Sequence, residues 1–200
     1  MSNEQLAEQL GLTPDQIYKS SGIRERRWAS RGETTSSLSV EALKKTGATL
    51  DEIDYLILGT MTTDRFIPGS APMVQTVVGL REIPCLDIRA ACCNTLYGLQ
   101  LSSALVTSGA ARNVALCLAE VQSAFLHLTP AAGTTSMLFG DGAAALVISN
   151  KGEEGALQIL DYTSLRTAST STIWVFDVQV LNLETLVNRR TSRHEWLVSQ

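Results

Sequence analysis

The sequence predicts an α/β fold in which a largely buried, mixed β-sheet is packed by helices. Short apolar runs alternate along the chain with longer segments of helical pattern, and this alternation is typical of layered α/β folds. The runs are apolar at nearly every position, as in strands that are covered on both faces. Apolar residues make up 44% and charged residues 18% of the 200 residues, which provides for a sizeable core and excludes a disordered chain.

Helices are expected over the segments 4–20, in two pieces, 36–46, 71–79 and 93–108. We expect Asn3 to cap the first piece and Gly11 to end it. Thr13 then caps the second piece, and Pro14 takes the first helical position, where a missing N–H costs little.

Strands are expected at 55–59, 85–88, 114–119, 143–149 and 157–163. Each is a short apolar run between turn residues. The polar and basic segment 22–33 is expected to be a loop, and residues 139–142 to be a glycine-rich turn.

One of the expected helices is unusual because it carries no charge. Residues 90–111 form a run of 22 residues without Asp, Glu, Lys or Arg. Their Asn, Gln, Ser and Thr side chains make the run too polar for a membrane span. A helix without a charged face is normally covered by protein on all sides. We therefore expect other parts of the fold to pack around it.

Charge and composition exclude several classes of function. The chain has 16 Lys+Arg against 20 Asp+Glu, and this net charge of −4 argues against nucleic acid or an anionic membrane as a partner. No membrane span or signal peptide is recognisable, so a cytoplasmic protein is expected. The four cysteines lack the spacing of a zinc site or of a disulfide framework, and we expect no metal and no cofactor.

Cys92 is the candidate nucleophile. It follows the strand expected at 85–88 after an Arg-Ala-Ala link, and it opens the uncharged helix. A thiol at a helix N-terminus lies near free backbone N–H groups and the positive end of the helix dipole, and both favour the nucleophilic thiolate. Burial acts in the opposite direction, and Cys92 and its neighbour Cys93 could instead be small core side chains.

A series of short motifs surrounds this cysteine: SGIRERRWA (21–29), DEID (51–54), GTMT (59–62), PGSA (68–71), DIRAAC (87–92), YGL (97–99), SG (108–109) and LFGDGA (138–143). In this order they resemble the motifs of the β-ketoacyl-[acyl-carrier-protein] synthase III family, a member of the thiolase-like superfamily. The resemblance covers residues 3 to about 162 and places Cys92 at the nucleophile position. Cys93 stands where the family usually has a small residue, and we interpret it as a core residue.

The resemblance implies a condensing acyltransferase. The cysteine would take an acyl group from acyl-coenzyme A or acyl-acyl-carrier protein (acyl-ACP). Malonyl-ACP would then lose CO2 and attack the acyl-cysteine, forming 3-oxoacyl-ACP at the start of fatty acid or related polyketide synthesis. The covalent intermediate splits one difficult reaction into two easier steps, and backbone N–H groups would hold the oxyanion. Members of the family are homodimers.

The resemblance also implies a set of substrate-binding side chains: Arg24, Arg26, Arg27, Phe66, Ile67 and Phe139. The three arginines could meet phosphates or could form a solvated basic loop. One of the two apolar loop residues would reach across the dimer into the acyl pocket of the partner, unless it only packs its own loop. Asp141, in the glycine-rich turn, is expected to brace the backbone beside the nucleophile and not to bind phosphate.

The chain departs from the family in ways that bear on activity. In the family a His and an Asn of the second half assist decarboxylation, and no matching segment follows residue 150 here. Neither His127 nor His194 has the family's sequence context; His127 is expected in a partly buried loop or strand and His194 in a solvated tail. Gln16, Ser20 and Ala132 stand where the family has residues that hold coenzyme A. The first strand of the family is also expected to be missing.

We therefore divide the chain into 1–162, the N-terminal half of a thiolase-like layered fold, and 163–200, a tail without family resemblance. The tail has no Gly and no Pro, which points to out-of-frame translation, and a genuine C-terminal segment is the alternative. Two other functions stay open: a catalytically incomplete, truncated half, and a non-enzymatic module that binds acyl groups or ACP. An isolated half would expose the uncharged helix, so we expect it to associate or to be poorly soluble.

Overall fold

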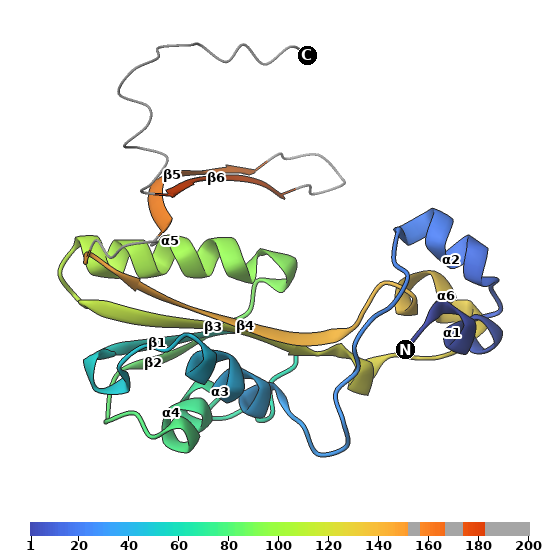
Figure 1. Cartoon of the computed structure of the whole chain (residues 1–200), viewed down its shortest axis with the longest axis horizontal. Coiled ribbons are helices and arrows are strands. Elements are labelled where there is room, and N and C mark those ends of the chain that lie inside the picture. The colour runs from blue at the N-terminus through green and yellow to red at the C-terminus, as the bar shows by residue number, and fades with distance from the viewer. Residues whose placement is uncertain (152–156, 167–173, 183–200) are drawn as a thin grey trace, which may run out of the picture. The chain divides into compact units, whose positions relative to one another are not determined.

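The computed structural model describes residues 1–151, 157–166 and 174–182, and contacts divide the chain into two units, 1–149 and 150–200. The first unit is built on a four-stranded sheet (Figure 1). Its strands, in the order β2-β1-β3-β4, are β1 (Tyr55–Gly59), β2 (Cys85–Ile88), β3 (Asn113–Val121) and β4 (Asp141–Ser149). β1 runs parallel to β2 and β3, and β4 runs antiparallel to β3. The expected mixed sheet is therefore confirmed.

Helices cover both faces of this sheet (Figure 1). α3 (Thr35–Lys45) and α4 (Ala71–Val78) lie on one face, and α5 (Asn94–Thr107) lies on the other. Three further helices gather beyond one end of the sheet: α1 (Asn3–Leu10), α2 (Pro14–Ser21) and the short α6 (Gly133–Ser136). Four 3-10 helices complete the first unit: Leu50–Glu52, Ala91–Cys93, Gln122–Phe125 and Pro130–Ala132.

The strands contribute to two cores, one on each face of the sheet. The core under α3 and α4 contains buried residues of these two helices and of the strands β1 and β3: Val40, Leu43, Leu56, Leu58, Val74, Ala115 and Cys117. The core under α5 contains Ile57, Val114 and Leu116. Successive residues of a strand point to opposite faces, so the run 56–58 supplies both cores. The apolar runs are thus buried on both faces, as predicted.

The first helices follow the expected capping chemistry with one difference. Ser2, and not Asn3, caps α1, because the Ser2 side chain accepts a hydrogen bond from the third helical N–H. Asn3 is the first helical residue, and its Nδ2 donates to the carbonyl of Ile23 at 2.8 Å. Gly11 ends α1 in the left-handed conformation with φ 62°, and Thr13 caps α2 as predicted.

In the second unit, two described strands pair antiparallel: β5 (Leu157–Arg166) and β6 (Trp174–Asn182). β5 begins where the sequence predicts and extends a few residues further. β6 lies in the 163–200 segment, for which we expected no regular element. The signal for a strand there is the sequence Phe-Asp-Val-Gln-Val at 176–180, which alternates apolar and polar residues. The boundary at 162/163 stays a prediction.

α5 meets the sheet through small and polar side chains. Its buried residues are Asn94, Gly98 and Ser102, which lie one turn apart. Gly98 is so close to β3 that an added Cβ would stand 2.6 Å from Cδ1 of Leu116. The other residues of α5 are partly or fully exposed, so the cover that we expected on all sides is not found within the first unit. Among the described residues, no helix has the length and apolar character to cross a membrane.

Candidate active site

Cys92 lies in a tight turn between the sheet and α5. β2 ends at Ile88, at the edge where its parallel neighbour β1 ends in Gly59. A 3-10 helix spans Ala91–Cys93, and α5 begins at Asn94. Cys92 is exposed. The sequence places it at the helix start, and the structure places it within the 3-10 turn that precedes the helix.

The four cysteines differ in their surroundings. Cys117 is buried in the sheet, and burial raises the pKa of its thiol to about 12. Burial, together with the carboxylate of Asp87, raises the pKa of the Cys85 thiol to about 11. Cys93 is half-buried at the N-cap of α5, so it is not the fully buried core residue that we expected. Cys92 is the one exposed thiol of the four, which argues against a role as a core side chain.

The backbone of the turn is strained beside Cys92. Ala91 has φ 49°, and among the described residues it is the one non-glycine residue with a positive φ. The left-handed region is costly for a residue with a Cβ atom and persists only where the surroundings enforce it. The turn that presents Cys92 is therefore held in place by other contacts.

The loop between β1 and α4 carries the two apolar residues expected near the substrate. Asp64 holds one end, since its carboxylate accepts hydrogen bonds from the N–H groups of Thr35 and Ser36, both at 3.0 Å. Asp87 holds the other end by accepting from the N–H groups of Ser70, at 2.9 Å, and Ala71, at 3.2 Å. Both carboxylates lie at helix N-termini, where negative charge is favourable.

At the tip of this loop, Phe66 and Ile67 are 86% and 87% exposed. The Phe66 ring stacks under the guanidinium of Arg89, whose carbon lies 5.5 Å from the ring centre. Arg89 also donates to the carbonyl of Met61 at 3.3 Å. Because Arg89 stands three residues before Cys92, the loop and the nucleophile turn are directly connected. Ordinary packing of these two side chains into their own loop is not what the structure shows.

Arg26 has a different task from the phosphate contact that the resemblance implies. Its side chain is buried, with 6% exposure. One Nη donates to Oδ1 of Asn3 at 2.9 Å and the other to the carbonyl of Met137 at 2.8 Å. Burial also lowers the pKa of the guanidinium. Arg26 joins α1 to the segment after α6, and its bonded guanidinium is not accessible to a phosphate.

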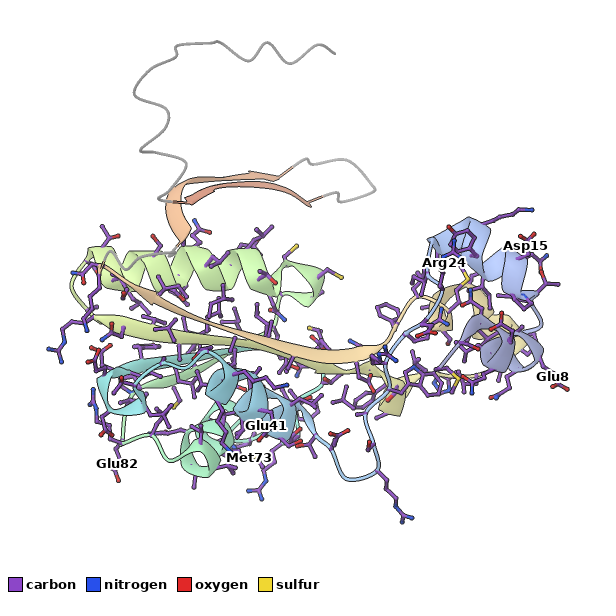
Figure 2. All side chains as sticks on the ribbon, in the orientation of Figure 1. Glu8, Asp15, Arg24, Glu41, Met73 and Glu82 are labelled. Carbon is purple, nitrogen blue, oxygen red and sulfur yellow. The ribbon has the colours of Figure 1, made fainter. Side chains whose placement is uncertain are left out.

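Arg24 and Arg27 are exposed, in contrast. The guanidinium of Arg24 lies over the Tyr18 ring, 4.5 Å from its centre, and donates to the Tyr18 hydroxyl at 3.1 Å. Figure 2 shows Arg24 beside α2. Arg27 lies 3.7 Å from the carboxylate of Glu25. Exposed pairs of this kind contribute little to stability, so both guanidinium groups are available to a ligand.

β4 already begins at Asp141, so the turn expected at 139–142 does not extend over its second half. Asp141 braces the backbone at this point. Asp141 accepts hydrogen bonds from the N–H of Ala29 at 2.6 Å and from the N–H of Ser123 at 2.8 Å. An added Cβ on Gly140 would lie 2.8 Å from Cβ of Arg26, so the close approach of the two backbones requires glycine. Phe139, two residues before Asp141, is half-buried.

The histidines and possible metal ligands add no further candidate. His127 is exposed in the loop before α6, and the partly buried position expected for it is wrong. Its carbonyl accepts a hydrogen bond from Ser136 Oγ at 2.8 Å. His194 lies outside the described residues. No group of three His, Cys, Asp or Glu side chains in the described ranges could hold a metal ion.

Two polar residues belong to the site although no motif identifies them. Oδ1 of Asn94 accepts a hydrogen bond from the N–H of Ala90 at 2.7 Å. Glu120 accepts from the N–H of Met61 at 2.8 Å and from Thr62 Oγ1 at 3.1 Å, and so joins the ends of β1 and β3. Asn94 could have been found from the sequence as an Asn at the start of a helix, because this residue type favours hydrogen bonds between its side chain and the backbone. Glu120 could have been found as a carboxylate near the end of an apolar strand.

Comparisons of sequence support the resemblance. A family model described as 3-oxoacyl-[acyl-carrier-protein (ACP)] synthase III matches residues 86–167. The β-ketoacyl-[acyl-carrier-protein] synthase III of Chlamydia caviae is 37% identical over 163 residues, and that of Roseiflexus castenholzii is 39% identical over 161 residues. These matches cover 80% and 78% of this chain and 48% of each relative. The chain thus spans about half the length of the curated relatives it matches.

Solved structures give the same result for the fold. The 3-oxoacyl-[acyl-carrier-protein] synthase III of Aquifex aeolicus has a TM-score of 0.75 at 29% identity, covering 84% of this chain and 54% of that one. A priming β-ketosynthase of a polyketide biosynthetic pathway has a TM-score of 0.74 at 27% identity, covering 84% and 50%. The fold of the first unit is therefore the N-terminal half of the thiolase-like fold, as the sequence predicts.

Proposed function

The chain belongs to the β-ketoacyl-[acyl-carrier-protein] synthase III family, and on this basis we propose that it forms the nucleophile-bearing half of a condensing acyltransferase. The observation that carries the proposal is the position of Cys92. It is exposed, it lies in a strained turn between a parallel strand and a helix, and it ends the motif DIRAAC at 87–92. Strand–turn–helix junctions of this kind present nucleophiles in several enzyme folds.

In the first step, Cys92 Sγ attacks the carbonyl carbon of an acyl thioester. A carbon–sulfur bond forms, and the carbonyl oxygen takes the negative charge. Backbone N–H groups of the turn, that of Cys92 among them, stabilise this oxyanion. The oxyanion then collapses and expels the thiol of coenzyme A or ACP, which leaves the acyl group on Cys92.

In the second step, malonyl-ACP loses CO2, and the resulting carbanion attacks the acyl carbonyl. Cys92 leaves as thiolate, and 3-oxoacyl-ACP is formed. By the resemblance, this step uses a His and an Asn from a second half. Because the matches span about half of each relative, an incomplete half that performs only the first step stays a second candidate.

The remaining site residues are proposed to bind the substrates. The exposed Phe66 and Ile67, connected to the nucleophile turn by Arg89, would meet the acyl chain, within a homodimer in which the partner supplies the pocket. Arg24 and Arg27 would meet the phosphates of coenzyme A or the carrier-protein prosthetic group. Phe139, in the turn braced by Asp141, is proposed to line the same site. The chemistry needs no cofactor.

Acyl transfer tests this proposal directly. The chain is incubated with acyl-coenzyme A thioesters of several chain lengths, and the added mass is located by peptide mapping. An acyl group on Cys92, lost in Cys92→Ala and kept in Cys93→Ala, supports the proposal. An intact, folded chain that takes no acyl group from any donor contradicts it.

Malonyl-ACP is then added to the acylated chain. Release of 3-oxoacyl-ACP indicates a complete synthase, whereas a stable acyl-cysteine indicates an incomplete half. ACP binding that survives Cys92→Ala, in a chain that is never acylated, indicates a non-enzymatic binding module.

A further inference from the structure

Asn94 closes the turn that contains Cys92. Its Oδ1 accepts a hydrogen bond from the N–H of Ala90 at 2.7 Å, four residues earlier in the chain. Its own backbone N–H donates to the carbonyl of Ala91. The N–H of Cys93 donates to the carbonyl of Ala90 at 3.0 Å. One residue therefore contributes two of these three bonds across the turn.

The hydrogen bond of the Asn94 side chain is well placed to keep Ala91 in its strained backbone conformation. Ala91 has φ 49°, and it lies between the donor of that bond and Cys92. Without an enforcing contact, an alanine would leave the left-handed region for a conformation of lower free energy. Such a change would move Cys92, because the two residues share a peptide bond.

Asn94 is itself fixed against the sheet. It is 5% exposed, and the end of β1 leaves room for it only because position 59 is glycine. A Cβ on Gly59 would stand 2.9 Å from Cβ of Asn94. The turn is therefore anchored to the carboxyl end of β1, the edge at which Cys92 is presented.

Core stability alone does not explain an asparagine at this position. Nδ2 of Asn94 is buried without a hydrogen-bond partner in the described part of the chain. A buried donor without a partner destabilises the fold, and a smaller apolar residue would avoid that penalty. What the amide provides is the acceptor for the N–H of Ala90.

We propose that Asn94 is a positioning residue, which holds Ala91 in the left-handed conformation and thereby keeps Cys92 in its reactive place. This inference rests on the proposed role of Cys92. Asn94 acts through the turn and does not contact the substrate, since its side chain is buried.

The test compares Asn94→Ala with a matched control, Ser102→Ala. Ser102 lies on the same buried side of α5, two turns further, and its Oγ is also buried without a partner. Two rates are measured on the whole chain: alkylation of Cys92 by iodoacetamide between pH 6 and 9.5, and acyl transfer from acyl-coenzyme A. The melting temperature reports the structural effect of each variant.

In Asn94→Ala, acyl transfer to Cys92 is expected to slow by about 10- to 100-fold, the cost of a displacement of about 1 Å at a reacting group. Alkylation at pH 7.5 slows by about two- to fivefold, because the thiolate loses its place beside the helix N-terminus. Ser102→Ala changes the melting temperature but neither rate. Rates in Asn94→Ala equal to those of the parent chain overturn the proposal, whatever happens to its melting temperature.

A second pair of variants tests the coupling to Ala91 and serves where Asn94→Ala does not fold. Ala91→Gly removes the penalty of the left-handed conformation, so Asn94→Ala should slow alkylation less in that background than in the parent. An equal effect in both backgrounds refutes the coupling. If the parent chain takes no acyl group, the proposed function fails, and the alkylation rates still decide the role of Asn94.

Discussion

The thiol of Cys92 should react ahead of those of Cys85 and Cys117 when the folded chain is treated with iodoacetamide at pH 8. Thiolates are the reacting species, so each rate depends on the thiolate fraction and on access. Cys92 is exposed, whereas the pKa values of Cys85 and Cys117 are raised to about 11 and about 12 by burial. We expect Cys92 to be modified well before the two strand cysteines.

The size of the difference follows from these pKa values. At pH 8 the thiolate fraction is about 0.001 for Cys85 and about 0.0001 for Cys117, against about 0.25 for an ordinary exposed thiol. The more basic thiolates are intrinsically better nucleophiles, which raises the alkylation rates of Cys85 and Cys117 by a factor of about 10 to 40. The net expectation is a rate about 20-fold lower for Cys85 and about 60-fold lower for Cys117, before steric protection is counted.

The assay is a time course of alkylation with peptide mass spectrometry, and the fully denatured chain is the control in which all four cysteines react alike. Raising the pH from 8 to 10 should raise the rate of Cys85 by about 100-fold, since both values lie below its raised pKa. Modification of Cys85 or Cys117 in the folded chain as fast as Cys92 at pH 8 would refute the placement of these thiols.

Three further predictions concern stability and association. Gly59→Ala should lower the free energy of unfolding by about 1–3 kcal/mol in urea denaturation, because the added Cβ would press on Asn94. Gly142→Ala is the control: the space around its Cβ is open, so it should change this free energy by less than about 0.5 kcal/mol. Ionisation of Cys117 should lower the free energy of unfolding by about 2 kcal/mol between pH 9 and 10.5, and this loss should be absent in Cys117→Ala. The sign follows from the raised pKa of Cys117: the stability that its protonated thiol provides is complete below the unfolded-state pKa and is lost as the pH rises toward about 12. Finally, the isolated chain should elute as associated species in size-exclusion chromatography with light scattering, and a monodisperse monomer with a cooperative melt would contradict this.

Local patterns were sufficient to predict most of the first unit. The strand at 85–88 has the predicted bounds, and the four strands of the main sheet all lie where apolar runs occur. Helix ends were also predictable, because a cap such as Thr13 or a terminal glycine such as Gly11 acts within a few residues. The proposal that Cys92 is a nucleophile depends on the family resemblance, since spacing alone leaves a cysteine at a helix start ambiguous.

Contacts between distant segments could not be predicted in the same way. The basic motif at 21–29 gives no sign that Arg26 is buried, because its partner carbonyl at Met137 lies 111 residues away. The proposed role of Asn94, at the start of α5, depends on Gly59 at the end of β1 and on the strained backbone at Ala91. In each case the deciding partner is brought close only by the completed fold.

The side that α5 turns to the sheet connects the fold to the chemistry. An uncharged helix could bury an apolar face, and here it buries Asn94, Gly98 and Ser102. Gly98 lets the helix axis approach Leu116, and this close approach fixes where the start of α5, and with it the turn of Cys92, meets the edge of the sheet. The remaining sides of α5 carry no charge and stay partly exposed. Because α5 begins two residues after Cys92, any structure that covers the first turn of α5 would also lie next to Cys92.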